Sequence, residues 1–207
     1  MSNKYDYCLH EMALDPNIKS LLPGRSHVYV YGAEWYDNVP IYVELYTIIG
    51  NHLQFQGIPK GQQKIITYKR ADNGMADGHV GGPYPKWNRD CEEMVFFYGT
   101  DPDNPMDLGA TVEFHLGEGE DEEVFTFDTP KCVFIPCNVK YGPIYIYNHH
   151  RNLVEAMVLT QGTRVACQTC SDLEFTADVE HIKELGCIDA LEGYKNVSSD
   201  IKGIIQE

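Results

Sequence analysis

The stretch Gly81–Tyr147 decides the fold and reads GGPYPKWNRDCEEMVFFYGTDPDNPMDLGATVEFHLGEGEDEEVFTFDTPKCVFIPCNVKYGPIYIY. Short segments rich in Val, Phe, Tyr and Ile alternate in it with the turn clusters GTDPDNPMDLG, LGEGEDEE and DTPK. Such an alternation is typical of antiparallel strands joined by tight turns. We therefore predict an all-β barrel or sandwich.

This stretch resembles the cupin superfamily, whose first motif has a leading glycine, two histidines and a glutamate at fixed spacing. With Glu93 on the glutamate, Gly81 falls on the leading glycine. Trp87 and Arg89 then occupy the two histidine positions. The spacing of the motif is therefore kept, whereas its metal-ligating histidines are replaced.

The second cupin motif is matched in the same way, with Pro136 on its proline, Asn138 on its glycine and Tyr141 on its histidine. The segment EEMVFFYGTDPDNPMDLGATVEFHLGEGEDEEVFTF also resembles a subgroup of small bacterial single-domain cupins. The resemblance implies a cupin-like double-stranded β-helix, which is a jelly-roll barrel.

Composition restricts the classes of function. A formal net charge of −15 on 207 residues argues against binding to nucleic acid or to an anionic membrane surface, which would repel it. No apolar run is long enough to span a membrane, and the N-terminus lacks the apolar core of a secretory signal. The seven cysteines, with Cys167 and Cys170 in a lone CxxC, are interpreted as reduced thiols. We expect an acidic cytoplasmic protein.

The chain divides into three parts. We predict an N-terminal arm with helix-like pieces at 1–25, a cupin-like β-barrel at 26–160 and a C-terminal helical extension at 161–207 that packs on the barrel. Within the barrel, residues 70–85 are rich in Gly, Pro and Asp and are predicted to form a long binding loop. The aromatic strands expected at 26–48 would suit pairing with a second copy, so we expect a homodimer.

Candidate site residues come from the two motifs. If one strand alternates from Trp87, then Trp87, Arg89, Cys91 and Glu93 share the face that lines the barrel. Arg89 would bind a carboxylate with its planar fork, beside Trp87 and Cys91. Glu93 would act as general acid or base, with Tyr141 as a phenolic donor opposite it. The alternative is that Arg89 and Glu93 form a structural ion pair.

These residues favour a protein that binds a small anionic metabolite, carboxylated or phenolic, inside its barrel. A carboxylate, a guanidinium and a phenol would support a metal-independent isomerase, epimerase or lyase that works by proton transfer. Some cupin sugar epimerases work without a metal, which is an analogy at the level of the family. A non-catalytic protein for ligand binding or assembly is a further alternative, so the sequence leaves enzymatic activity open.

A metal-dependent reaction is the remaining alternative. No cofactor is favoured by the motif positions, yet Glu93 with the off-motif His79 and His115 would form a two-histidine, one-carboxylate site. Such a donor set suits Fe(II), Mn(II) or Zn(II), and would support a cupin dioxygenase or hydrolase.

Overall fold

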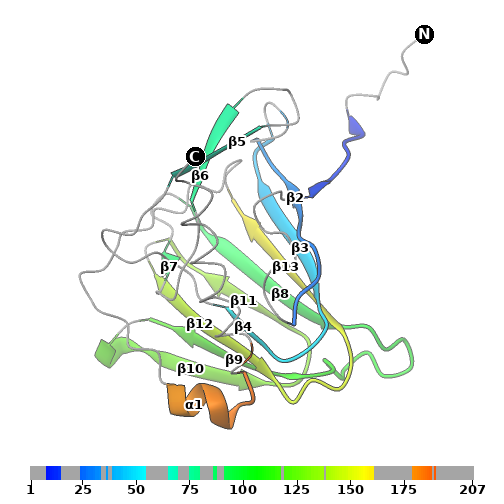
Figure 1. The fold of residues 1–207 in the computed structure, drawn as a ribbon, viewed down its shortest axis with the longest axis vertical. Helices are drawn as coiled ribbons and strands as arrows, with labels where there is room; N and C mark the ends of the chain where they lie inside the picture. The colour runs from blue at the N-terminus through cyan, green and yellow to red at the C-terminus, as the bar shows by residue number, and fades with distance from the viewer. Residues whose placement is uncertain are drawn as a thin grey trace.

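Two antiparallel sheets form most of the described part of the chain, which we analyse in a computed structural model (Figure 1). The structure describes residues 8–14, 24–33, 36, 39–54, 65–69, 75–79, 86–87, 91–117, 119–137, 139–160, 179–187 and 189. At 65–69, 75–79, 86–87 and 179 only the backbone is described.

The first sheet has six strands, in the order β1 (Ala13–Leu14), β2 (Tyr29–Tyr31), β3 (Tyr42–Ile48), β13 (Leu153–Leu159), β8 (Glu93–Gly99) and β11 (Lys131–Ile135). The second has five strands: β10 (Glu123–Phe127), β9 (Thr111–Leu116), β12 (Lys140–Tyr147) and β4 (His52–Gln54), with β7 (Lys86–Trp87) also pairing with β12. A separate hairpin pairs β5 (Ile65–Lys69) with β6 (Met75–His79). The 3-10 helix η2 (Gly119–Asp121) precedes β10, and α1 (Val179–Glu184) follows the barrel.

The order of the strands is that of a jelly roll. The chain crosses repeatedly between the sheets, so that β3, β13, β8 and β11 face β4, β12, β9 and β10. This architecture of two sheets built from Greek keys is the one that cupins share. The predicted all-β, cupin-like fold is therefore confirmed.

The core lies between the two sheets. Alternate residues of β3 and β13 are buried, as expected for strands with one inward face. Phe97 of β8 meets Phe114 of β9 edge to face, with ring centroids 6.3 Å apart, and Phe114 stacks on Tyr141 of β12 at 5.8 Å. These rings join the first sheet to the second.

Helix α1 covers the outer face of the second sheet, beside β9 and β10 (Figure 1). Its Ile182 is fully buried, and the Cys187 thiol lies 3.5 Å from the carbonyl oxygen of His52 on β4. The helix ends at Glu184, and the φ of 70° at Gly186 just beyond it lets the N–H of Cys187 donate to the carbonyl of Ile182. No helix among the described residues is long and apolar enough to cross a membrane.

Three predictions about local structure were wrong. The predicted loop at 70–85 contains β6, which pairs with β5. The helix-like N-terminal piece contains β1 instead, and β1 pairs with β2. The strand expected to run from Trp87 to Glu93 is not continuous, because β7 belongs to the second sheet and β8 to the first.

The strands expected to mediate dimerisation are not at a sheet edge. β2 is flanked by β1 and β3, and β3 is flanked by β2 and β13. The main-chain groups of β3 are thus paired on both sides within the chain. The homodimer stays a prediction, and these two strands do not offer a free edge for it.

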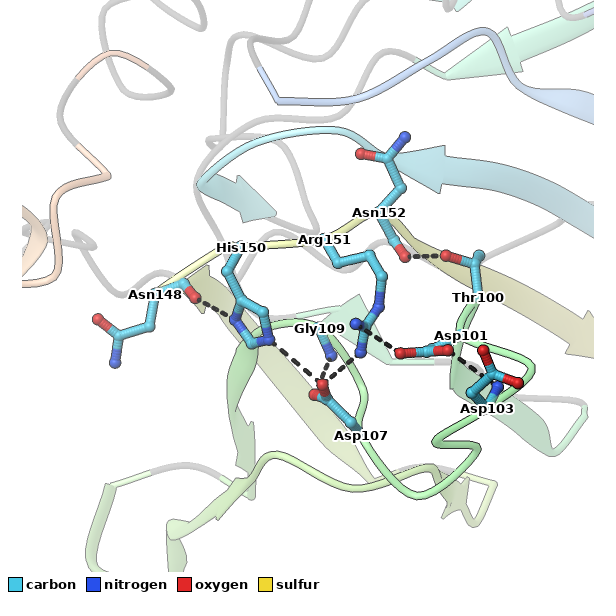
Figure 2. Close-up of polar contacts among 9 residues, drawn as sticks. All are labelled: Thr100, Asp101, Asp103, Asp107, Gly109, Asn148, His150, Arg151 and Asn152. Carbon is cyan, nitrogen blue, oxygen red and sulfur yellow. Dashed lines mark hydrogen bonds and ion pairs between the residues drawn. The ribbon is translucent and has the colours of Figure 1, made fainter.

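The turn cluster GTDPDNPMDLG is held against the β12–β13 turn by Arg151 (Figure 2). The guanidinium bridges Asp107 and Asp101, with a nitrogen 2.8 Å from the Asp101 carboxylate. The backbone N–H of Gly109 also donates to Asp107, at 2.9 Å. Gly109 has a φ of 90°, and a Cβ there would lie 2.5 Å from the carbonyl oxygen of Arg151. This part of the cupin-like segment therefore has a structural role.

We expect Asp107→Asn to lower thermal stability at neutral pH, because it weakens the contacts with Gly109, Arg151 and His150. The N–H of Gly109, then Arg151 and His150, lower the pKa of Asp107 from its ordinary 3.8. Its contribution is thus present above pH 3.8 and is lost as the pH falls through the lower folded-state pKa. Melting curves of variant and wild type should converge in acid. Asp103→Asn, in the same loop but exposed, is the control and should match wild type at every pH.

Candidate functional site in the barrel interior

Polar side chains occupy part of the barrel interior, where an all-apolar core would be the simpler solution. None of them is more than 3% exposed. They come from five strands of both sheets: Tyr42, Glu44 and Tyr46 of β3, His52 and Gln54 of β4, Glu93 of β8, Tyr141 of β12 and Glu155 of β13. Buried polar groups at this density need hydrogen-bond partners, and they find many of them in one another.

Glu155 is the centre of the first group of contacts. The hydroxyl of Tyr46 donates to one carboxylate oxygen of Glu155 at 2.6 Å, and the amide nitrogen of Gln54 donates to the other at 2.7 Å. The same amide nitrogen lies 2.5 Å from the Tyr46 hydroxyl oxygen. Glu155 and Tyr46 meet because they are directly paired between β13 and β3. We call Tyr46, Gln54 and Glu155 the Glu155 cluster.

Burial raises the pKa of Glu155 to about 7. The hydrogen bonds from Tyr46 and Gln54 and the positive charge of Arg25 lower this pKa, and the negative charge of Glu44 raises it further. Burial, followed by the charge of Glu155, also raises the pKa of Tyr46 well above 10. Near neutral pH the cluster therefore holds a carboxyl group that can give or take a proton beside a phenol that keeps its own.

Glu93 and Tyr141 form a second contact in the interior. The hydroxyl of Tyr141 donates to a carboxylate oxygen of Glu93 at 2.7 Å, and both side chains are fully buried. The sulfur of Met157, two residues from Glu155 on β13, lies 4.0 Å from the same hydroxyl. The structure thus brings together the two residues that the motifs single out as an acid–base pair.

The structure describes some of the other candidate residues and not the rest. Cys91 precedes β8, is 3% exposed and belongs to the apolar core. The backbone of Trp87 pairs with Lys140, next to Tyr141, but the side chain of Trp87 lies outside the described residues. Arg89 and the side chain of His79 also lie outside them.

His115 lies on the opposite side of the second sheet from Glu93. Its neighbour Phe114 points into the core, so His115 points outward with Glu113. Glu113 accepts from His115 at 2.9 Å and from His181 of α1 at 2.8 Å. Burial raises the pKa of Glu113, but these two hydrogen bonds outweigh it and the pKa is lowered. The expectation that His115 joins Glu93 in a metal site is therefore wrong.

The donor set at the motif positions does not fit the metal of a cupin. An indole and a guanidinium, at Trp87 and Arg89, have no lone pair for a metal ion. Tyr141, at the third histidine position, instead gives its hydroxyl hydrogen to Glu93. Within the described ranges, no group of three or more His, Cys, Asp or Glu side chains is arranged to hold a metal ion.

Sequence reasoning missed the Glu155 cluster, although a signal for it was present. In LVEAMVL, Glu155 stands in phase with Leu153 and Leu159, which are inward-facing. In YVELYTI, Tyr46 is likewise in phase with the inward-facing Ile48. A carboxylate on the apolar phase of a strand must be buried, and a buried carboxylate is a candidate for function.

Comparisons with known proteins were made for sequence and for structure. No protein-family model and no curated protein matches the sequence. Solved structures with a similar arrangement include a single-residue mutant of Bacillus subtilis oxalate decarboxylase, with 8% identity over 74% of this chain and a TM-score of 0.42. Another structure of that enzyme, from a study of its Mn(II) centers, has 8% identity over 79% of this chain and a TM-score of 0.43.

A third structure is peruvianin-I, a cysteine peptidase from Thevetia peruviana latex, with 7% identity, 76% of this chain, 70% of that chain and a TM-score of 0.40. This chain covers 28% and 33% of the two oxalate decarboxylase chains, and so spans a third of that enzyme or less. The fold assignment follows from the strand order of this chain.

The raised pKa of Glu155 predicts a decline of stability with pH. Between pH 4.5 and about 7 the folded state keeps the proton of Glu155, whereas the unfolded state loses it. A shift of this size corresponds to about 3 kcal/mol of unfolding free energy, present below pH 4.5 and lost by about pH 7. Glu155→Gln should lack this decline in urea unfolding at a series of pH values.

Glu123→Gln, an exposed substitution on β10, is the control and should keep the wild-type pH profile. Identical profiles for Glu155→Gln and wild type would contradict the raised pKa.

Proposed function

We propose that this protein is a metal-independent enzyme of the isomerase, epimerase or lyase type, which transfers a proton on a small carboxylated or phenolic metabolite inside its barrel. One observation carries the proposal: Glu155 is buried with a pKa of about 7 and is in direct hydrogen-bond contact with Tyr46 and Gln54. General acid–base catalysis is most efficient when the pKa of the group lies near the working pH.

Each member of the Glu155 cluster has a role. The Glu155 carboxylate accepts a proton from a carbon of the substrate, and the electron pair of that C–H bond moves toward an adjacent carbonyl. Tyr46 keeps its proton, because its pKa is raised, and it fixes the orientation of the Glu155 carboxylate. The amide of Gln54 holds the second carboxylate oxygen. Such fixed positions lower the cost of orienting the base during the reaction.

Glu93 and Tyr141 supply a second acid–base pair in the same interior. An isomerase returns a proton at another carbon, and an epimerase returns it on the opposite face of the same carbon. Two groups that bind protons independently serve either reaction. Met157 contacts Tyr141 and stands on the same inward face of β13 as Glu155, two residues away. The roles expected for Arg89, Trp87 and Cys91 in binding the anionic group of the substrate stay a prediction from the sequence motifs, because Arg89 and the Trp87 side chain lie outside the described residues.

Hydrogen exchange with solvent tests the proposal without knowledge of the natural substrate. The protein is incubated in D₂O with a panel of small hydroxy-, keto- and aromatic carboxylic acids, and proton NMR records the loss of C–H signals. We expect wild type to exchange at least one acid and Glu155→Gln to lose the activity. General acid–base groups typically contribute about 10²- to 10⁴-fold to rate.

Matched controls keep the test specific. Glu92→Gln changes an exposed carboxylate next to Glu93, and Tyr98→Phe changes an exposed tyrosine; both should exchange at the wild-type rate. Glu93→Gln and Tyr46→Phe should be slower. Hydrogen exchange that persists in Glu155→Gln would contradict the proposal. Ligand binding by wild type without any hydrogen exchange would indicate a binding protein instead of an enzyme.

Metal content provides a separate check. Because the residues at the motif positions do not fit a cupin metal, we expect elemental mass spectrometry of protein purified without chelator or a nickel column to find iron, manganese and zinc well below stoichiometry. Near-stoichiometric metal that resists dialysis would favour the metal-dependent dioxygenase or hydrolase. In that case the ligands would have to be sought beyond the described residues.

A further inference from the structure

Arg25 directs its guanidinium toward the barrel interior, over the ring of Tyr46 in the Glu155 cluster. The residue is 8% exposed, and its buried Nε has no acceptor among the described residues. Its guanidinium lies over the ring of Tyr46, whose centroid is 4.7 Å from the guanidinium carbon.

The backbone, and not the side chain, fixes Arg25 in this place. Arg25 forms an antiparallel bridge with Ile48, and residues paired in this way project to the same face of a sheet. Ile48 is fully buried in the core, so the side chain of Arg25 is directed inward with it. On either side, Ile49 donates its N–H to the carbonyl of Gly24 at 2.8 Å, and Ser26 donates its N–H to Thr47 at 2.8 Å.

Two buried carboxylates, Glu155 and Glu44, act on Tyr46 together with Arg25, and both accept hydrogen bonds from other side chains. Both oxygens of Glu155 accept from Tyr46 and Gln54, and Glu44 accepts from Tyr42 at 2.9 Å. The charge of Arg25 lowers the pKa of Glu155 and of Tyr46, so it acts on the cluster through space. A buried guanidinium normally pairs with a carboxylate, because removing its charge from water is costly.

We propose that Arg25 binds the carboxylate of the ligand, above the ring of Tyr46. The planar fork of a guanidinium fits a carboxylate with two parallel hydrogen bonds. Because Tyr46 touches both Arg25 and Glu155, a carboxylate on Arg25 places the neighbouring carbon of the ligand on the side of the Glu155 carboxyl. This inference names the anion-binding residue of the proposed acid–base site and rests on that function for the identity of the ligand.

Binding of simple carboxylates tests the inference independently of turnover. The probes are acetate, benzoate and succinate, with acetamide and benzamide as neutral counterparts, and the readouts are melting temperature and isothermal titration calorimetry. We expect at least one carboxylate to raise the melting temperature of wild type with increasing concentration, and its amide to have no effect. Arg25→Met should bind that carboxylate at least about tenfold more weakly, which is about 1.4 kcal/mol.

Two further variants separate a binding role from a structural one. Arg25→Lys keeps the charge but not the fork, so its affinity should lie between those of wild type and Arg25→Met. Arg151→Met removes an arginine that bridges Asp101 and Asp107 and should keep wild-type affinity for the carboxylate. Without any probe and at pH 5, where Glu155 keeps its proton, Arg25→Met should be at least as stable as wild type, because it removes a nearly buried charge whose Nε lacks a partner among the described residues.

Several outcomes would overturn the inference. These are a wild type that no carboxylate stabilises, an Arg25→Met variant that keeps wild-type affinity, and an Arg25→Met variant that at pH 5 is less stable than wild type or does not fold. The last would make Arg25 an internal counter-ion for Glu44 and Glu155. Failure here is distinct from failure of the proposed function, which is decided by deuterium exchange in Glu155→Gln.

Discussion

The pleat of a strand sends every second side chain inward, and this constraint determines which groups meet inside the barrel. On β13 it selects Glu155 and Met157, and on β3 it selects Glu44 and Tyr46. The direct pairing of β13 with β3 then sets Glu155 beside Tyr46 without any special loop. The candidate site is thus a property of two regular strands, and a slip of one residue would move all its members to the outer face.

Burying polar side chains costs free energy, and in this protein hydrogen bonds and apolar packing offset that cost. The Glu155 carboxyl is hydrogen-bonded at both oxygens, yet burial still dominates and leaves its pKa near neutrality. Aromatic contacts between Phe97, Phe114 and Tyr141 hold the sheets together around this region. The fold therefore supplies enough apolar packing to tolerate a few groups that do not serve stability, which is the usual arrangement at a functional site.

The sequence predicts the class of fold better than it predicts the site. Alternating segments between residues 81 and 147 are enough for an all-β barrel, and the motif spacing leads to the Glu93–Tyr141 contact. Contacts between distant residues are not readable in this way: Tyr46 and Glu155 are 109 positions apart, and nothing local to either predicts the other. The metal role expected for His115 was wrong, because the alternation of β9 sends His115 outward with Glu113 while Phe114 points into the core.

The position of β13 has a consequence for how the protein is made. This strand lies between β3 and β8 and pairs with both over its whole length, although it is the last of the described strands to be synthesised. Until residue 159 has left the ribosome, β3 and β8 each present a row of unpaired main-chain groups. Such edges pair readily with other chains, so aggregation competes with folding until the last strand is in place.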